Sequence, residues 1–173
     1  LGVKAVRYPI VWESIAPHDP DVLDFSWHDE RLDLLRERGI EVIGGLLHHG
    51  SGPCYTDLLD PGFPAKFAAF AASVAERYPW IRQWTPVNEP LTTARFSALY
   101  GHWYPHAATE RAFLRALVNQ CLGTLKAMRS IRAVVPDALL VQTEDLGKTF
   151  STAPLRYQAT YENQRRWLSF DLL

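Results

Sequence analysis

The sequence predicts an α/β fold in which parallel strands alternate with helices, arranged as part of a (β/α)8 barrel. Four short apolar runs alternate with segments whose apolar residues recur at helical spacing, and no hairpin signal joins neighbouring runs. Polar residues follow the runs at their carboxyl ends, where barrel enzymes keep their chemistry. The turn after the first run, residues 11–17, contains no glycine, which argues against a doubly wound dinucleotide-binding sheet.

The first predicted strand covers residues 3–10 and is apolar enough to suit burial on both faces. We expect the first helix to begin at Ser26, which forms a capping box with Asp29, and to end at Gly39. The second predicted strand covers residues 41–47 and runs directly into a glycine-rich loop.

The second helix is predicted over residues 64–78, between Pro64 in its first turn and Pro79 after its end. Its apolar residues lie on a single helical face. They are Phe67, Phe70, Ala71, Val74, Ala75 and Tyr78. The third strand is predicted over residues 82–87 and leads into a long aromatic segment over 91–108.

A third helix is predicted from Thr109 until Pro136 stops it, followed by a fourth strand over 138–142 and a helical tail around 157–167. We expect the buried stripe of this long helix to contain Leu114, Leu117, Val118, Cys121, Leu122 and Leu125.

The number of strand and helix units limits how much of a barrel the chain can form. A complete barrel needs eight units and about 250 residues, so 173 residues hold roughly half of one. We therefore expect one domain over residues 1–173, a fragment truncated at both ends. Its exposed strand edges and apolar patches should make the isolated fragment poorly stable or cause it to associate with itself.

Composition excludes several classes of partner. The net charge is -1, so no excess of positive charge attracts nucleic acid or an anionic membrane, and we expect neither partner. Two cysteines are too few for a disulfide framework, and a cytoplasmic location is favoured. No His and Cys residues have a metal-ligand spacing, and His102 with His106 is the only candidate pair. We expect no metal and no cofactor.

One heptapeptide carries the candidate chemistry: Trp84-Thr85-Pro86-Val87-Asn88-Glu89-Pro90. A carboxylic acid beside an amide at a barrel rim suits glycoside hydrolysis, because one carboxyl must protonate the leaving oxygen. The amide of Asn88 can bind a sugar hydroxyl near the reacting carbon. An Asn that caps a helix, followed by a surface Glu, gives the same tripeptide, so Asn-Glu-Pro alone is weak evidence.

Three motifs in order strengthen that interpretation. Residues 6–12, Val-Arg-Tyr-Pro-Ile-Val-Trp, precede residues 46–49, Leu-Leu-His-His, and then the Asn-Glu-Pro heptapeptide. In this order they resemble glycoside hydrolase family 1, the β-glucosidase family of (β/α)8 barrels. The resemblance runs from about residue 1 to 105 and more weakly to the end. It implies a chain that covers about strands two to five of that barrel.

The resemblance implies a retaining β-glycosidase acting on a carbohydrate substrate. Glu89 would be the general acid/base, and Asn88 would bind the hydroxyl next to the anomeric carbon. His49 would bind another hydroxyl, Arg7 would orient the nucleophile's carboxylate, and Trp12 would support the second strand. Arg7 can equally be a structural ion-pair partner inside a barrel.

The sequence also departs from the family pattern. Gly50 and Ser51 stand where the family usually has an aromatic residue and an Asp, which removes a stacking wall. The family's nucleophile lies on a later strand outside this chain. Since double displacement needs that second carboxyl, we expect the 173 residues alone to show no glycosidase turnover.

Several residues have open assignments. Strand alternation favours His49 over His48 for the site, with His48 facing the core or a helix. Glu144 and Asp145 can enter the cleft from the fourth strand. The aromatic segment can wall a sugar site, but packing onto the barrel is the favoured role for its residues Phe96, Tyr100, Trp103 and Tyr104.

Two other functions remain open. A barrel that has lost efficient hydrolysis can serve as a sugar-binding module. Residues 143–147 and 162–167 are similar to a branch of family-1-like domains fused to dTDP-4-dehydrorhamnose reductase-like domains, so such a domain is the partner expected in that case. A cellulase-like barrel of the same clan also has an Asn-Glu pair, but the Trp-Thr-Pro-Val and Leu-His-His motifs argue against it.

Overall fold

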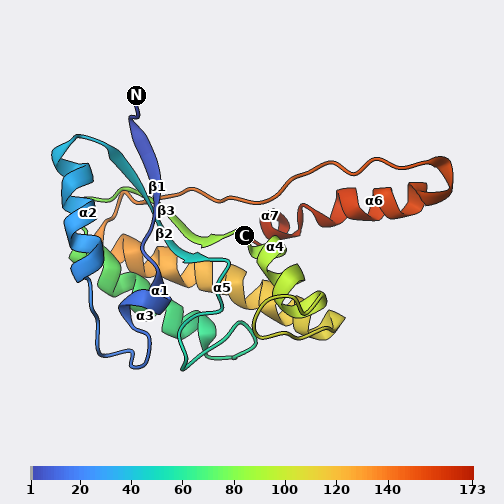
Figure 1. The fold of residues 1–173 in the computed structure, drawn as a ribbon, viewed down its shortest axis with the longest axis horizontal. Helices are drawn as coiled ribbons and strands as arrows, with labels where there is room; N and C mark the ends of the chain where they lie inside the picture. The colour runs from blue at the N-terminus through green and yellow to red at the C-terminus, as the bar shows by residue number, and fades with distance from the viewer. Residues whose placement is uncertain (1) are drawn as a thin grey trace.

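The computed structural model describes residues 2–173, and the described strands form one parallel sheet in the order β1-β2-β3-β4 (Figure 1). The strands are β1 (Ala5–Pro9), β2 (Glu41–His48), β3 (Gln83–Asn88) and β4 (Leu139–Leu140). Neighbouring strands in the sheet are also consecutive in the chain. The predicted parallel order is confirmed. A helix connects each strand to the next, as parallel pairing of consecutive strands requires.

The helices begin and end close to the predicted positions, and their bounds are as follows. They are α1 (Trp12–Ile15), α2 (Ser26–Glu37), α3 (Phe63–Arg77), α4 (Pro90–Ala94), the π-helix η1 (Arg95–Leu99), α5 (Glu110–Val134), the 3₁₀ helix η2 (Ala153–Leu155), α6 (Arg156–Arg165) and α7 (Leu168–Leu172). Thr109 caps α5, because its hydroxyl accepts a hydrogen bond from the N–H of Ala112 at 3.1 Å. The segment predicted as a long aromatic loop begins with α4 and η1.

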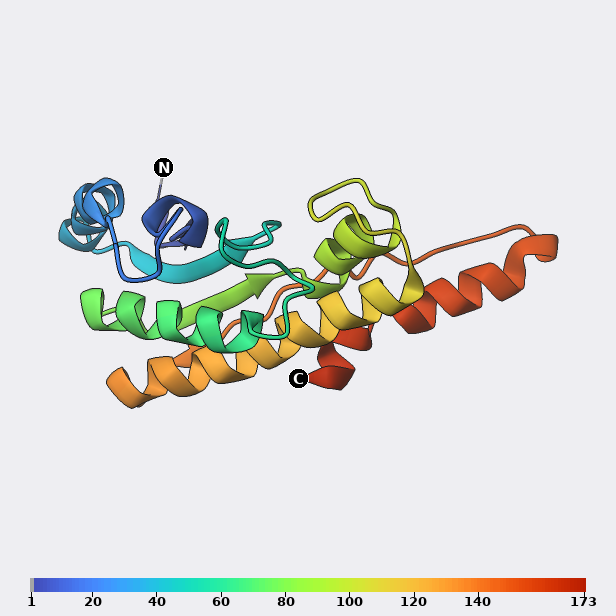
Figure 2. The same ribbon diagram turned by 90° about the horizontal axis from the view of Figure 1, so that it is seen from below.

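Helices α3 and α5 lie side by side along one face of the sheet (Figure 2). The predicted face of α3 is buried throughout, from Phe67 to Tyr78. Trp12 is 1% exposed and packs against this helix, with its ring stacked on Phe70 at 5.4 Å between centroids. The support role expected for Trp12 therefore has a physical basis in an aromatic core beneath the carboxyl ends of the strands.

The apolar stripe predicted for α5 is wrong for four of its members. Leu114, Val118, Leu122 and Leu125 are 36–54% exposed. The helix turns a different face inward, formed by Phe113, Ala116, Leu117, Gln120, Cys121, Thr124, Ala127, Met128 and Ile131. A small residue is required at Gly123, where α5 packs closely on α3 and the backbone lies against the rings of Phe63 and Phe67.

Two further expectations are wrong. Strand β1 is not buried on both faces: its residues alternate between exposed and half-buried, and it is an edge strand with β2 as its only partner among residues 2–173. Ser26 does not cap α2 with Asp29: Ser26 is the first helical residue, and its N–H donates to the Asp24 carboxylate at 2.9 Å. Asp29 instead accepts hydrogen bonds from Arg77 and Tyr78, which joins α2 to the end of α3.

The fourth strand is shorter than predicted, two residues rather than five. It is extended only by an isolated bridge between Asn88 and Thr143. The segment after it and helix α6 project away from the sheet (Figure 1). None of the helices within residues 2–173 combines the length and apolarity needed to cross a lipid bilayer.

A substitution at Gly44 in β2 tests the packing against Trp84, its partner in the neighbouring strand β3. A Cβ at this position would lie 2.8 Å from Cε3 of the buried Trp84 ring. We expect Gly44→Ala to lower the free energy of unfolding by about 1–3 kcal/mol, the usual cost of overpacking. Denaturant titration of the protein measures this loss.

Gly45→Ala is the matched control, since a Cβ there has no neighbour closer than 3.6 Å. An equal loss in the two variants would contradict the steric explanation, because only Gly44 faces the tryptophan.

Candidate active site

The four residues expected at the site come together at the carboxyl edge of the sheet. Arg7 lies in β1, His49 directly follows β2, and Asn88 ends β3 just before Glu89. The register pairs His48 with Asn88, so the ends of β2 and β3 are level. Because the strands are parallel, their carboxyl ends deliver all four side chains to one rim.

The side chain of Asn88 is the centre of a hydrogen-bond network and is 3% exposed. Its Oδ1 accepts from Nη1 of Arg7 at 2.7 Å and from the hydroxyl of Thr143 at 3.1 Å. Its Nδ2 lies 3.0 Å from Nε2 of His49. Arg7 only donates hydrogen bonds, so the facing amide atom must be the oxygen, and this fixes the orientation of the amide.

The network also fixes the tautomer of His49. Nδ2 of Asn88 is a donor, so Nε2 of His49 must accept, and the ring proton lies on Nδ1. Nδ1 then donates to the hydroxyl of Thr93 at 3.1 Å, and that hydroxyl donates to the backbone carbonyl of Asn88 at 3.3 Å. The imidazole is therefore held on both sides by groups from β3 and α4.

Glu89 lies beside this network and is open to ligand. Its Oε2 is 3.8 Å from Nε2 of His49, and about 28% of its side chain is exposed. Its backbone is left-handed, with φ 45° and ψ 67°, and it is the residue before the first turn of α4. The carboxyl group thus reaches the rim from a turn that directly continues the strand carrying Asn88.

Two of the site residues have a left-handed backbone although neither is glycine. His49 has φ 57° and Glu89 has φ 45°. Such conformations cost about 1–3 kcal/mol each and persist where the surrounding structure enforces them, commonly at functional sites. Both lie directly after a strand end, so the strain turns each side chain toward the rim.

A hollow of about 110 Å³ opens next to the network, and Arg7, His48 and Asn88 contribute to its wall. The other lining residues are Pro9, Gly45, Leu47 and Thr85. The expectation that His48 faces the core or a helix is wrong, because its side chain is exposed and lines this hollow. Strict alternation fails here because the left-handed turn at His49 brings the two imidazoles together, with centroids 4.7 Å apart.

Partial desolvation of the imidazole lowers the pKa of His48 below its ordinary value of 6.5, and the guanidinium of Arg7 acts in the same direction, as would a protonated His49. A neutral His48 avoids a further cation beside Arg7. The hollow therefore contains one permanent positive charge, the guanidinium of Arg7, which can hold a carboxylate.

The aromatic segment contributes directly to the site. The ring of Trp103 stacks on Phe96 at 4.7 Å and contacts the ring of His49 at 5.2 Å. The hydroxyl of Ser51 donates to the carbonyl of Tyr104 at 2.9 Å, which fastens this segment to the loop after β2. The favoured packing role describes Phe96, whereas Trp103 both packs and forms a wall beside His49.

Glu13 fills the space that Gly50 leaves empty. A Cβ on Gly50 would lie 2.0 Å from Oε1 of Glu13, and that oxygen accepts a hydrogen bond from the N–H of Gly52 at 3.1 Å. Burial raises the pKa of Glu13, and the backbone hydrogen bonds it accepts only partly offset this effect. A buried carboxyl group thus occupies the place where a larger side chain would otherwise stand.

Glu144 does not enter the cleft. Its carboxylate accepts from the N–H groups of Leu91 and Thr92, at 2.8 and 3.3 Å, and so caps the first turn of α4. It also accepts from the hydroxyl of Ser169 at 2.5 Å. Glu144 therefore holds the helix that follows Glu89, while the carboxylate of Asp145 accepts from the N–H of Gly147.

The sequence did not predict that Thr93, Thr143 and Glu13 contribute to the site. Each makes its contact across a large sequence separation, and the residue type alone gives no signal for it. Within residues 2–173 no cluster of three or more His, Cys, Asp or Glu side chains has a geometry that would hold a metal ion.

Comparison with known proteins places this geometry in context. No protein-family model matches the chain. "Beta-glucosidase A" of Thermotoga maritima is 26% identical over 146 residues, covering 79% of this chain and 32% of the relative. "Probable inactive beta-glucosidase 14" of Oryza sativa subsp. japonica is 25% identical over 185 residues, covering 100% and 36% respectively. The chain thus spans about a third of the length of these curated relatives.

Solved structures establish the fold. The T. maritima β-glucosidase in complex with deoxynojirimycin superimposes with a TM-score of 0.82 at 20% identity, over 95% of this chain and 40% of that one. Its complex with glucoimidazole gives a TM-score of 0.80 at the same identity and coverage. The expected fold is confirmed: the chain is a parallel α/β segment that forms part of a (β/α)8 barrel.

The buried carboxyl of Glu13 gives the stability of the protein a predictable pH dependence. Because its pKa is raised in the folded state above the ordinary 4.5, the folded protein binds more protons and loses stability as pH rises through that range. We expect Glu13→Gln to be more stable than the parent at pH 7, with the difference shrinking toward pH 4.

Thermal melts of both proteins across this pH range measure the effect, with Glu30→Gln as the control because that side chain is 83% exposed. A Glu13→Gln protein that is less stable than the parent at pH 7 would contradict the burial argument.

Proposed function

We propose that this chain is part of a retaining β-glycosidase of the β-glucosidase type, with Glu89 as the general acid/base. The observation that carries the proposal is the position of Glu89: a partly exposed carboxyl on a strained turn, 3.8 Å from the fixed imidazole of His49. Nε2 of His49 accepts from Asn88 and lies beyond hydrogen-bond distance of this carboxyl, so a proton on Glu89 can pass to the leaving oxygen of a substrate.

In this mechanism Glu89 first gives its proton to the glycosidic oxygen as the bond to the anomeric carbon breaks. A carboxylate nucleophile forms a covalent bond to that carbon from the opposite face, about 5–5.5 Å from the acid. Glu89, now ionised, then takes a proton from water, and the water oxygen displaces the nucleophile. No residue of this chain is assigned as the nucleophile, which we place in the rest of the protein.

Asn88 and His49 have the hydrogen-bonding capacity to bind two neighbouring sugar hydroxyls. A sugar can replace the hydrogen bond from Nδ2 of Asn88 to Nε2 of His49. The other hydrogen bonds of these two side chains run to Arg7, Thr143 and Thr93 and would keep both side chains in place. One hydroxyl would accept from Nδ2 of Asn88, and its neighbour would donate to Nε2 of His49. Such contacts strengthen in the transition state of glycoside hydrolysis.

Arg7 would orient the nucleophile's carboxylate. Its Nη1 is fixed by Asn88 and its side chain lines the hollow, so its remaining N–H groups can bind an incoming carboxylate. Arg7 does not form a structural ion pair within residues 2–173, because no carboxylate lies within 4.0 Å of its guanidinium.

The relatives support a carbohydrate substrate. The T. maritima protein is a β-glucosidase and its structures hold deoxynojirimycin and glucoimidazole. The chain covers only about two fifths of that protein, so we assign the activity to the full-length protein and expect none from the 173 residues alone. We treat these residues as one barrel segment without an internal boundary.

A second candidate is a sugar-binding barrel with weakened catalysis, joined to a sugar-nucleotide reductase-like domain. Gly50 leaves no side chain beside His49, and the carboxyl of Glu13 takes its place. The rice relative, named as probably inactive, shows that chains of this type are not all assigned activity. This alternative predicts sugar binding without turnover.

Substitution of Glu89 tests the proposal in the full-length protein. We expect Glu89→Gln to lower kcat/KM for an alkyl β-glucoside by about 10²–10⁴-fold, the usual contribution of a general acid/base. The loss should be smaller in the glycosylation step of an aryl glucoside whose leaving group needs no proton. Steady-state and burst kinetics on both substrates measure the two losses.

Glu30→Gln, on an exposed position of α2, should leave the kinetics unchanged. Equal kcat/KM of Glu89→Gln and the parent on the alkyl glucoside would remove Glu89 from the mechanism. A parent protein that binds glucose analogues but turns over neither substrate would favour the second candidate.

A further inference from the structure

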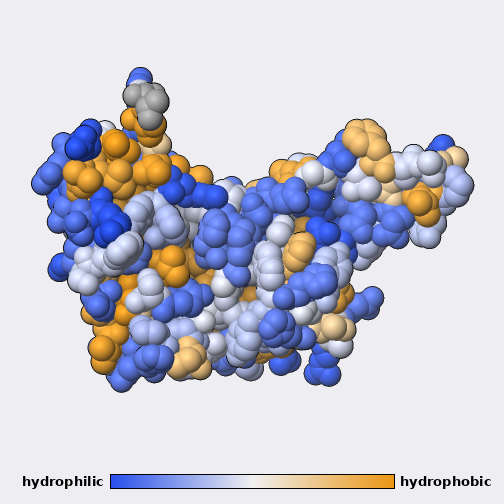
Figure 3. Space-filling model, in the orientation of Figure 1, coloured by the Kyte–Doolittle hydropathy of each residue, from blue (hydrophilic) through white to orange (hydrophobic). Residues whose placement is uncertain are grey.

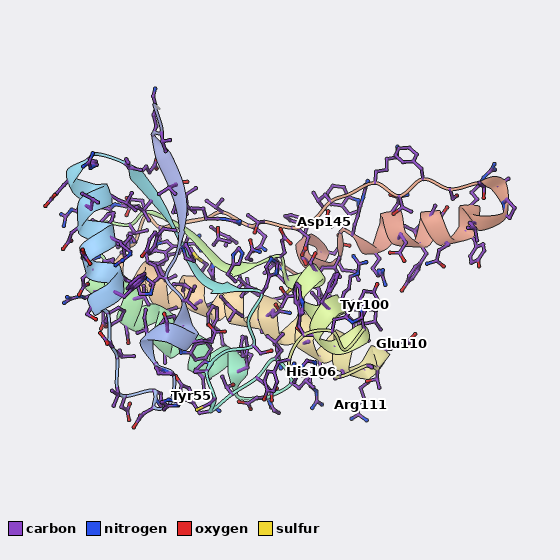
Figure 4. The ribbon with its side chains drawn as sticks, in the orientation of Figure 1. Tyr55, Tyr100, His106, Glu110, Arg111 and Asp145 are labelled. Atoms are coloured by element: carbon purple, nitrogen blue, oxygen red, sulfur yellow. The ribbon has the colours of Figure 1, made fainter. Side chains whose placement is uncertain are left out.

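Two sequence motifs that the proposed site does not use come together around a second hollow. The segment after Thr143 and the carboxyl end of α6 face α4 and η1 across a volume of about 280 Å³. The residues that line it are Leu91, Arg95, Asp145, Gly147, Lys148, Thr149, Glu162, Arg165 and Arg166. Figure 4 labels Asp145 and Tyr100 in this region. The surface at the base of the projecting segment is mostly hydrophilic, whereas its tip carries hydrophobic residues (Figure 3).

The walls of this hollow are held in place by hydrogen bonds. Nη1 of Arg166 donates to the carbonyl of Leu146 at 3.1 Å, and the side chain of Asn163 bonds both the N–H and the carbonyl of Thr149. Arg165 is 8% exposed and donates to the carboxylate of Glu162 and to the hydroxyl of Tyr100. The two motifs therefore form one built structure and do not merely lie near each other.

The charges around the hollow do not balance. Four cationic side chains line it, against the two carboxylates of Asp145 and Glu162, which leaves an excess of two positive charges. Glu162 is already paired with Arg165. Within residues 2–173 no carboxylate lies within 4.0 Å of the cationic groups of Arg95, Lys148 or Arg166.

One of these cations also has an unsatisfied donor. Nε of Arg166 is buried and has no hydrogen-bond partner among the described residues. A buried donor without a partner is destabilising, the more so when it is charged, so native structures rarely leave one without a ligand, water or ion. An anion bound in the hollow would satisfy the donor and neutralise the excess charge together.

We propose that this hollow binds a phosphoryl group. A phosphate monoester carries a charge of about -1.5 to -2 near pH 7, which matches the excess, whereas a carboxylate would leave one cation uncompensated. Arginine side chains suit phosphate because their planar fork donates two parallel hydrogen bonds. The hollow shares no lining residue with the one beside Arg7, so the inference stands independently of the proposed function.

Calorimetric titration of the full-length protein tests the inference. The probes are inorganic phosphate, glucose 6-phosphate, ADP and acetate, which separate a free ion, a sugar phosphate, a nucleotide and a carboxylate. We expect at least one phosphate compound to bind with 1:1 stoichiometry and acetate to bind at least tenfold more weakly. Lys148→Gln and Arg166→Gln should each weaken that binding about tenfold or more.

Lys148 is exposed and makes no ion pair or side-chain hydrogen bond within residues 2–173, only a surface contact with the exposed ring of Phe150, so its variant keeps the fold intact even if Arg166→Gln does not. Arg129→Gln, on the exposed side of α5, is the matched control and should bind like the parent. Absence of binding by all three phosphate compounds would overturn the inference. So would equal binding of acetate, or unchanged binding in Lys148→Gln.

Discussion

The hydrogen bonds of the Asn88 side chain connect all four strands of the described sheet at its carboxyl edge. Oδ1 accepts from Arg7 in β1 and from Thr143 beyond β4, while Nδ2 reaches the imidazole that follows β2. Hydrogen bonds to charged groups are worth about 1.5–3 kcal/mol, so the contact to Arg7 is the strongest of these. The position of every proposed sugar-binding group depends on this one buried amide.

Glu89 depends on the same network through its backbone. The left-handed turns at His49 and Glu89 are unfavourable for side chains with a Cβ, and the structure around them must supply the compensation. Thr93 bonds the carbonyl of Asn88 on one side of the second turn, and Glu144 caps the helix on the other. The strained turn is thus fixed at both ends, which keeps the carboxyl of Glu89 at the rim although no side chain of residues 2–173 forms a hydrogen bond with it.

The sequence predicted the features that follow from periodicity and chain order. Strand order, the buried face of α3 and the meeting of Arg7, His49, Asn88 and Glu89 at one rim all follow from parallel strands joined by helices. Burial was predicted less well where packing decides it. On α5 three of the predicted leucines face outward, and the buried face combines large residues such as Phe113 and Met128 with small ones such as Gly123, which close packing on α3 requires.

The side-chain contacts could not be predicted in this way. His48 joins the hollow because a left-handed residue follows it, and alternation rules assume an extended backbone. Thr93, Thr143 and Glu13 contact the site from other elements, and their identities as ordinary polar residues give no hint of a partner. Such contacts depend on how the loops are positioned in the folded protein, and no repeating pattern in the sequence reports these positions.

The tautomer of His49 tests the central claim most directly, because it follows from the Asn88 network alone. Nitrogen NMR of the ¹⁵N-histidine-labelled protein, assigned with a His49→Gln variant, reports which ring nitrogen carries the proton. A neutral ring protonated on Nδ1, with Nε2 accepting, is the predicted result. A proton on Nε2 near neutral pH would show that Asn88 does not donate to His49, and would contradict the network on which the proposed site rests.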